Sequence, residues 1–292
     1  MAGMTWELLT CGRNEGKEMT RLRNLSCACR PLLAGAAIFY IALATPCPGL
    51  SIGKAGTNGS NGKQEMQRNH PVIVSTWASH DIRPDGNLKK PFWSAAQRVS
   101  FDQAAFVRTS YPQLETQVAS RWTRDYLYLA FWCHYETLNL FEGEDPHKER
   151  WGLWEKDVVE AFIAPDSRRP SHYFEFEVAP NNQWIDLEID LTKKPFNDPQ
   201  WNSGFDHVTR VDAAQHVWTS EWRIPIAALT SSGIARGEVW HLNFYRSDGT
   251  DPHRHNMSWG ALPQKLPQNS FHQPKSFGTV HFVKSHAPGR DN

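Results

Sequence analysis

Three glutamates in strand-like segments have the types and spacing to do chemistry. Glu175 and Glu177 alternate with phenylalanines in the segment 174–178, and Glu160 lies in an apolar stretch after a polar loop. Two carboxyl groups flanking a glycosidic bond are enough for its hydrolysis. The simpler interpretation of Glu175 and Glu177 is a solvated strand face, and the functional interpretation is the floor of a sugar groove.

Tryptophan is the second residue type that could bind a ligand, because the chain carries 13 of them in 292 residues. Trp151 and Trp154 lie in the polar segment 147–157, which makes a purely core role for Trp154 difficult to assign. A pyranose has apolar C–H faces and polar edges, so aromatic rings stack on it while carboxylates and amides bind its hydroxyls. Four other tryptophans lie in strand patterns and are expected in the core: Trp132, Trp218, Trp222 and Trp240.

Other chemistry has weaker support. Asp251, His253 and His255 could ligate a metal, since imidazoles two residues apart can share a strand face, but the polar loop around them argues against it. The body of the chain holds no nucleophile elbow, phosphate-binding loop, zinc-protease helix or C-x-x-C pair. Cys133, in a strand pattern, is expected to be a small buried hydrophobe. No catalytic residue is therefore assigned.

Composition excludes several classes of protein. The 31 basic residues balance 31 acidic ones, so the net charge is zero. A neutral chain lacks the basic face that nucleic acid or an anionic membrane surface requires. With 40% apolar residues the chain is too hydrophobic for wholesale disorder, and its length allows one large or two ordinary domains.

The N-terminal segment is expected to be a targeting signal. Three arginines precede the 13-residue apolar run 32–44, which is shorter than the roughly 20 residues that span a bilayer. Ala42 and Ala44 form the small-x-small pattern of a signal peptidase site. The sequence predicts a signal peptide over 1–44, cleavage after Ala44, a secreted or periplasmic location and no membrane span in the mature chain.

Two details of this region stay open. Met19 would start a signal peptide of ordinary length, which would leave 1–18 outside the protein. A lipoprotein anchored at Cys47 is the alternative to cleavage after Ala44, although Pro46 makes a poor lipidation motif. The segment 45–70 is rich in Gly, Ser, Asn and Lys and is expected to be a flexible linker.

The body of the chain has the pattern of an all-β protein. Apolar and polar residues alternate with period two, and turn-rich segments separate the alternating runs. This predicts an antiparallel β-sandwich with few short helices over 71–284, followed by a disordered tail, 285–292. The expected strands are 126–133, 174–178, 184–191, 217–224, 239–244 and 278–283.

Seven ordered segments together resemble carbohydrate-binding module family 9 and its relatives with a DOMON-like fold. They run from Asp85-Gly86 with Phe92-Trp93, through the W-E-x-D segment at Trp154, to Ser258-Trp259 and the segment 271–278. The resemblance covers roughly 71–284. It implies a β-sandwich that binds sugar and accompanies enzymes acting on plant polysaccharides such as xylan, with structural calcium occurring in the fold.

The resemblance also implies a binding site. Sugar would lie between Trp154 and Phe271, with Phe271 standing where sugar-binding members carry tryptophan. Glu160 matches a carboxylate on the strand after the first aromatic, and Glu177 occupies the place of a strand arginine. The amides before the second aromatic map onto Gln268 and Asn269.

The function expected from these observations is that of an exported, non-catalytic protein that binds an oligosaccharide or polysaccharide, with a separate glycoside hydrolase as a partner. Three alternatives remain. A DOMON-like haem-binding module would use Met257 and a histidine as axial ligands. A glycoside-active enzyme would use Glu160 with Glu175 or Glu177. A sandwich without a binding site would serve in assembly.

Overall fold

The computed structural model describes residues 70–107, 109–143, 145–263 and 270–284. The predicted signal peptide over 1–44, nearly all of the predicted linker and the predicted tail over 285–292 lie outside these residues. Within the described part of the chain, no helix is both long enough and apolar enough to cross a membrane.

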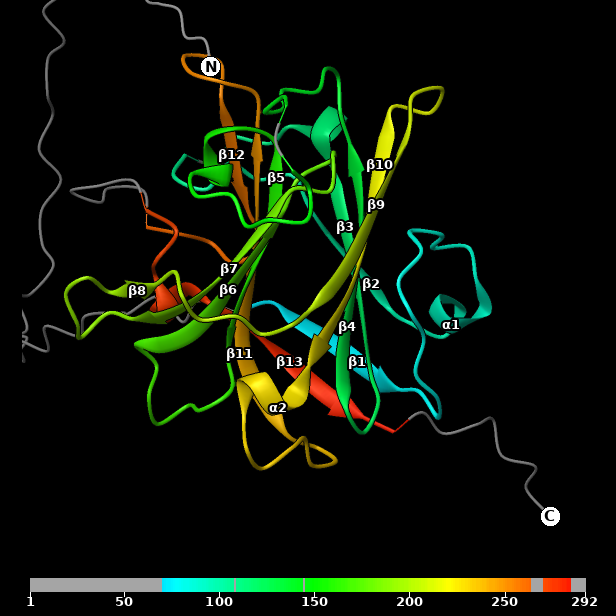
Figure 1. The fold of residues 1–292 in the computed structure, drawn as a ribbon, viewed down its shortest axis with the longest axis vertical. Helices are drawn as coiled ribbons and strands as arrows, with labels where there is room; N and C mark the ends of the chain where they lie inside the picture. The colour runs from blue at the N-terminus through cyan, green and yellow to red at the C-terminus, as the bar shows by residue number, and fades with distance from the viewer. Residues whose placement is uncertain (1–69, 108, 144, 264–269, 285–292) are drawn as a thin grey trace, which may run out of the picture. The chain divides into compact units, whose positions relative to one another are not determined.

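The described residues form thirteen strands and five short helical segments (Figure 1). The strands are β1 (Val72–Trp77), β2 (Arg98–Phe101), β3 (Thr116–Trp122), β4 (Tyr126–His134), β5 (Val158–Ala164), β6 (His172–Val178), β7 (Trp184–Asp190), β8 (Asn197–Asp198), β9 (Asp206–Asp212), β10 (Val217–Pro225), β11 (Val239–Asp248), β12 (His255–Ser258) and β13 (Gly278–Val283). The α-helices are α1 (Pro91–Ser94) and α2 (Ile226–Leu229), and the 3-10 helices are η1 (Pro112–Leu114), η2 (Leu153–Glu155) and η3 (Pro274–Ser276).

All of these strands belong to one mixed sheet. Its order is β8-β7-β6-β5-β11-β13-β1-β3-β4-β10-β9, with β12 paired to β11 and β2 paired to β3. The predicted all-β class is confirmed, but the sheet is not purely antiparallel, because β1 runs parallel to both β13 and β3. Strand β1 joins two segments far apart in sequence, and no local pattern reveals the direction in which a strand pairs.

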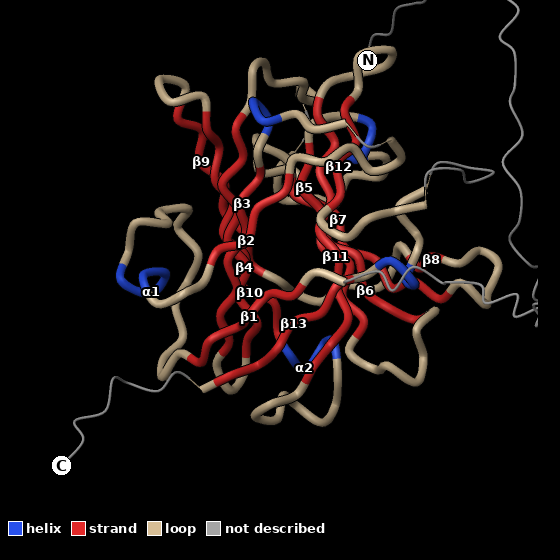
Figure 2. Tube along the Cα trace, turned by 180° about the vertical axis from the view of Figure 1, so that it is seen from behind, coloured by secondary structure: helices blue, strands red, loops and turns tan. Residues whose placement is uncertain are grey.

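The sheet curls into two facing halves. Figure 2 shows β3, β4, β9 and β10 forming one wall and β5, β6, β7 and β11 the other, with β1 and β13 between them. We call these walls the β4 half and the β5 half. The main core fills the space between them, and both walls contribute to it: Leu129, Phe131 and Trp222 from the β4 half, and Ala161, Phe176 and Phe244 from the β5 half.

A second apolar layer covers the outer face of the β5 half. Alternation along β5 sends Val159, Ala161 and Ile163 into the main core, while Val158 and Phe162 point outward into this second cluster. The same alternation in β6 places Phe174 and Phe176 inside. Glu175 and Glu177 consequently share the outer face with Glu160, where loops and further aromatic side chains cover them.

The tryptophan predictions are confirmed at three of four strand positions. Trp218, Trp222 and Trp240 are fully buried, and Cys133 is a free, buried thiol. Trp132 is a correction: it is only partly buried on the outer face of β4, where the guanidinium of Arg98 lies 3.7 Å from its ring centroid. Alternation alone could not separate it from the core tryptophans, because both faces of β4 are apolar.

Candidate functional site

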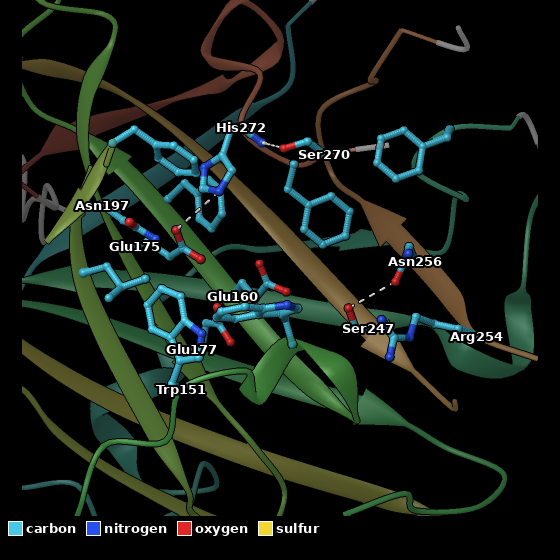
Figure 3. Close-up of a pocket in the computed structure, with 16 residues that line it drawn as sticks. Trp151, Glu160, Glu175, Glu177, Asn197, Ser247, Arg254, Asn256, Ser270 and His272 are labelled. Carbon is cyan, nitrogen blue, oxygen red and sulfur yellow. Dashed lines mark hydrogen bonds and ion pairs between the residues drawn. The ribbon is translucent and has the colours of Figure 1, made fainter. Parts of the chain in front are cut away.

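A cavity of about 380 Å³ opens on the outer face of the β5 half. Its floor comes from β5, β6 and β7, and loops before β5, β8, β12 and η3 supply its walls. Figure 3 shows Trp151, Glu160 and Glu177 on one side, Ser247, Arg254 and Asn256 on another, and Ser270 and His272 on a third. A volume of this size falls within the range of small-molecule sites, about 300–1,000 Å³.

The strand register gathers three carboxyl groups on the cavity floor. Glu160 of β5 and Glu177 of β6 are directly opposite one another, and Glu175 pairs with Phe162 one alternation further along. One carboxylate oxygen of each glutamate lies within 4.8 Å of the others. The three residues are almost completely buried, with exposed fractions of 1% for Glu160, 4% for Glu175 and 0% for Glu177. The solvated strand face is therefore wrong for Glu175 and Glu177.

Burial and mutual repulsion make these groups hard to ionise. Burial raises the pKa of Glu160 well above its ordinary value, and the charge of Glu175 raises it further, while Arg254 opposes the shift. Burial also raises the pKa of Glu177 well above its ordinary value, reinforced by Glu160 and Glu175. Burial also raises the pKa of Glu175, and two smaller effects oppose the rise: the electrostatic influence of His272 and a hydrogen bond from the carboxyl group of Glu177.

Two basic side chains border the acidic floor. The Nε2 atom of His272 lies 4.0 Å from Oε2 of Glu175, while its Nδ1 atom lies 2.7 Å from the hydroxyl of Tyr173. Arg254 is largely buried and donates to the backbone carbonyl of Glu155. His272 and Arg254 hydrogen-bond elsewhere, so they offset the acidic charge without satisfying the carboxylate oxygens.

Two indoles form an aromatic wall beside the carboxylates. Trp151 and Trp154 pack edge to face, with ring centroids 5.1 Å apart. Trp151 is 54% exposed although it lines the cavity, whereas Trp154 is partly buried. An exposed indole at the mouth of a cavity offers a flat apolar surface to a ligand.

Phe271 lies against other rings. Tyr245 stacks on it with a centroid distance of 4.2 Å and an interplanar angle of 8°, and its hydroxyl donates to the Phe271 carbonyl. Phe106 also stacks with it, at 5.8 Å. The face of Phe271 that packs against Tyr245 is therefore closed to a sugar. Phe271 can contact a ligand only with the part of its ring that is left uncovered.

Asp157 fixes the loop that carries the indoles. Its Oδ1 atom accepts from the backbone N–H of Gly249 at 2.6 Å, and its Oδ2 atom accepts from that of Asn139 at 2.9 Å. Burial raises the pKa of this carboxyl to about 6. A single side chain thus ties the start of β5 to the loop after β4 and to the turn after β11.

Replacing Asp157 by asparagine is expected to lower the free energy of unfolding by about 1–3 kcal/mol at pH 7, because one amide hydrogen then faces a backbone donor. Urea denaturation followed by fluorescence measures the change. Asp125, an exposed carboxylate beside Arg124, is the matched control, and D125N should stay within about 0.5 kcal/mol of the parent. Equal stability of both variants would contradict this role for Asp157.

The structure brings together most of the residues that the sequence pointed to. Trp154, Glu160, Glu177 and Phe271 all line the cavity. Gln268 and Asn269 lie outside the described residues. The sequence analysis also considered Trp151 as a ligand-binding residue and Glu175 as part of a sugar groove, and both line the cavity. It gave no role to other lining residues, among them Phe106, Arg254 and His272.

Two other interpretations of the sequence fare less well. Among the described residues, Glu160, Glu175 and Glu177 are the one set of three potential metal ligands close enough to share an ion, and Asp251, His253 and His255 do not form such a set. Met257, the axial ligand that a haem-binding module would use, is fully buried in the main core between the two halves. It therefore does not face the cavity, which lies on the outer face of the β5 half.

Comparison with known proteins identifies the fold family. The family described as carbohydrate family 9 binding domain-like matches residues 84–285. A relative from Arthroderma benhamiae, named as an extracellular protein, is 28% identical over 235 residues, which cover 74% of this chain and 100% of that protein.

Solved structures share the same architecture at low identity. A candidate carbohydrate-binding protein from Bacteroides uniformis superposes with a TM-score of 0.58 at 16% identity, covering 73% of this chain and 99% of that one. A family 9 carbohydrate binding module from Caldicellulosiruptor kristjanssonii, in complex with cellotriose, gives a TM-score of 0.51 at 15% identity, covering 74% and 96%. The structure of a family 9 module from the same organism in complex with glucose gives a TM-score of 0.51 at 15% identity, covering 75% of this chain and 100% of that one. Because the family match spans more than half of the 292 residues, this chain belongs to the carbohydrate family 9 binding domain-like family.

Proposed function

We propose that this protein is an exported, non-catalytic module that binds an oligosaccharide in the cavity on the outer face of the β5 half. The observation that carries the proposal is the composition of that cavity. Indole rings form one wall, and the rest of the lining combines phenyl rings with carboxyl, amide, hydroxyl, imidazole and guanidinium groups. This combination matches a pyranose, which needs apolar surface for its faces and hydrogen-bonding groups for its hydroxyls.

The roles within the site follow from this match. Trp151 and Trp154 supply the stacking surface, and Phe271 limits the opposite side with its exposed edge. Glu160 and Glu177 accept hydrogen bonds from sugar hydroxyls, and Arg254 and Asn256 donate to ring or hydroxyl oxygens. Fold and family support a sugar ligand, since the related module from Caldicellulosiruptor kristjanssonii has been solved with cellotriose and with glucose.

The arrangement of the carboxyl groups supports a binding role rather than hydrolysis. A glycosidase places its two carboxyl groups on either side of the scissile bond. Here all three glutamates belong to the adjacent strands β5 and β6 and form one floor. A sugar resting on that floor would have every carboxylate on the same side.

Export and a polysaccharide context complete the proposal. The basic, apolar and small-residue pattern of 1–44 supports secretion, as does the relative named as an extracellular protein. The ligand would be a fragment of a plant polysaccharide, held for a separate glycoside hydrolase.

The proposal is tested by calorimetric titration of the purified protein with xylo-, cello- and manno-oligosaccharides, in the presence of calcium. Saturable binding with a dissociation constant between about 1 μM and 1 mM is expected for at least one series, because a wet, shallow site gains little net energy per contact. The same samples are assayed for reducing-sugar release, which should stay at background. Absence of binding across the panel would contradict the proposal and favour an assembly role, and release of reducing sugar would favour the enzyme.

A further inference from the structure

The acidic floor of the cavity holds three carboxyl groups, and among the described lining residues only two basic side chains, Arg254 and His272, border it. Three carboxyl groups converge within 4.8 Å, on residues that are at least 96% buried. Like charges directly opposite one another on neighbouring strands destabilise a sheet, and Glu160 and Glu177 are such a pair. The neighbouring basic side chains, Arg254 and His272, make their own hydrogen bonds to Glu155 and Tyr173.

The carboxylate oxygens on this floor also lack donors. Among the described residues, no group donates a hydrogen bond to either oxygen of Glu177, to Oε1 of Glu160 or to Oε2 of Glu175. These atoms line the cavity rather than the main core. A buried carboxylate without water or a donor is costly, so the arrangement is one that a positive ligand would complete.

We propose that Glu160, Glu175 and Glu177 bind a calcium ion at the cavity floor, and that this ion presents its remaining coordination positions to the hydroxyls of the sugar. Calcium takes six to eight oxygen ligands at about 2.3–2.6 Å, so two oxygens on one ion can be separated by up to about 5 Å. The spacing of the three glutamates falls within this limit. Three carboxylates leave several positions open toward the cavity.

The donor set favours calcium over other cations. Oxygen-only ligation disfavours zinc and copper, which prefer imidazole and thiolate. Magnesium holds its oxygens at about 2.0–2.1 Å in a strict octahedron, which requires a tighter cluster. Two other positive species could neutralise the floor: a proton shared between Glu177 and Glu175, or the ammonium group of an amino sugar. Both are outcomes of the experiment below.

The metal is tested first without sugar. The purified protein is stripped with EGTA and titrated with calcium chloride by calorimetry, and with terbium by luminescence excited through Trp151 and Trp154. We expect Glu177→Gln to lose one bound calcium per chain, or to bind it at least tenfold more weakly. We also expect this variant to lose the sensitised terbium signal. Glu136, an exposed carboxylate after β4, provides the control, and E136Q should bind as the parent does. Circular dichroism verifies that both variants are folded.

The second measurement tests the coupling to sugar, and that half of the inference rests on the proposed function. Oligosaccharide affinity is measured in calcium and in EGTA, with an amino sugar included in the panel. We expect removal of calcium to weaken binding of neutral sugar at least tenfold. Calcium binding that is the same in Glu177→Gln and the parent would overturn the metal site and leave the shared proton as the explanation.

The remaining outcomes separate the two claims. Sugar binding of equal strength in EGTA and calcium would overturn the coupling while the proposed function stands. Calcium lost in Glu177→Gln, with no sugar bound under any condition, would support the metal site and contradict the proposed function. Preferential binding of the amino sugar in EGTA, without calcium binding, would replace the metal by an ammonium group.

Discussion

Replacing Trp154 by alanine is expected to weaken oligosaccharide binding about 30-fold or more. Truncating a central aromatic residue in a binding site costs about 2 kcal/mol or more, and each 1.4 kcal/mol is tenfold in affinity. Trp154 borders the cavity and supports the exposed ring of Trp151 edge to face, so its loss removes stacking surface and frees its neighbour. Titration calorimetry with the best oligosaccharide of the panel measures the effect without relying on tryptophan emission.

The matched control for this prediction is Trp132→Ala. Trp132 is also a partly buried tryptophan, but it lies on the outer face of the β4 half under the guanidinium of Arg98. Its replacement should leave the affinity within about twofold of the parent. If Trp154→Ala is folded and binds as tightly as W132A, the sugar does not stack on this wall and the site lies elsewhere.

Replacing Glu177 by glutamine is expected to stabilise the metal-free protein by about 1–3 kcal/mol at pH 7. The substitution keeps the size of the side chain and removes a carboxyl group whose ionised form is buried without a hydrogen-bond donor among the described residues. In a domain of this length, each kcal/mol corresponds to a rise in Tm of about 2–4 °C. Thermal unfolding in EGTA, followed by circular dichroism, measures the change.

The sign of this effect reverses the usual behaviour of a carboxylate in a salt bridge. Because the pKa of Glu177 is raised in the folded protein above its ordinary value of 4.5, folding favours the protonated form. The contribution of protonated Glu177 to the free energy of unfolding is fully present below pH 4.5. It is lost as the pH rises through the pKa that Glu177 has in the folded protein. The stabilisation by Glu177→Gln should therefore be close to zero at pH 4 and grow toward pH 7.

An exposed glutamate serves as the control for the stability measurement. Glu136→Gln removes the same charge at the surface and should change the free energy of unfolding by less than about 0.5 kcal/mol at either pH. A parent protein more stable than Glu177→Gln in EGTA at pH 7 would show that the ionised carboxylate has a partner that compensates for its burial. Calcium should narrow or invert the difference, because it binds the parent and not the variant.

The sequence predicted the strands best where alternation was strongest. The predicted run 278–283 coincides with β13, and 217–224 differs from β10 by one residue. Seven strands were not among the predicted runs: β1, β2, β3, β5, β8, β9 and β12. Some of them are short or exposed, and β3 and β5 are buried on both faces, which removes the alternation. β1 (Val72–Trp77) has the largest effect on topology, since it pairs in parallel with strands from both ends of the fold.

For the site, the sequence indicated the residue types and the structure decided their roles. The polar loop around Trp154 and the strict alternation of Glu175 and Glu177 were visible as patterns along the chain. Phe271 was found through the resemblance to family 9, but its stacking on Tyr245, a residue 26 positions away, was not. Arg254 and His272 carried no pattern of their own, because the loops that hold them meet the floor only in the folded chain.

By itself, then, the sequence determined the all-β class, the family and the faces of individual strands, because those properties follow from local periodicity and from motif order. Only the tertiary structure decided which faces meet. The pairing of β5 with β6 places Glu160 opposite Glu177, and the second apolar layer with its covering loops turns a face that looked solvated into a buried acidic floor. Strand register and burial depend on contacts between distant segments, and those contacts create the charge that a ligand would neutralise.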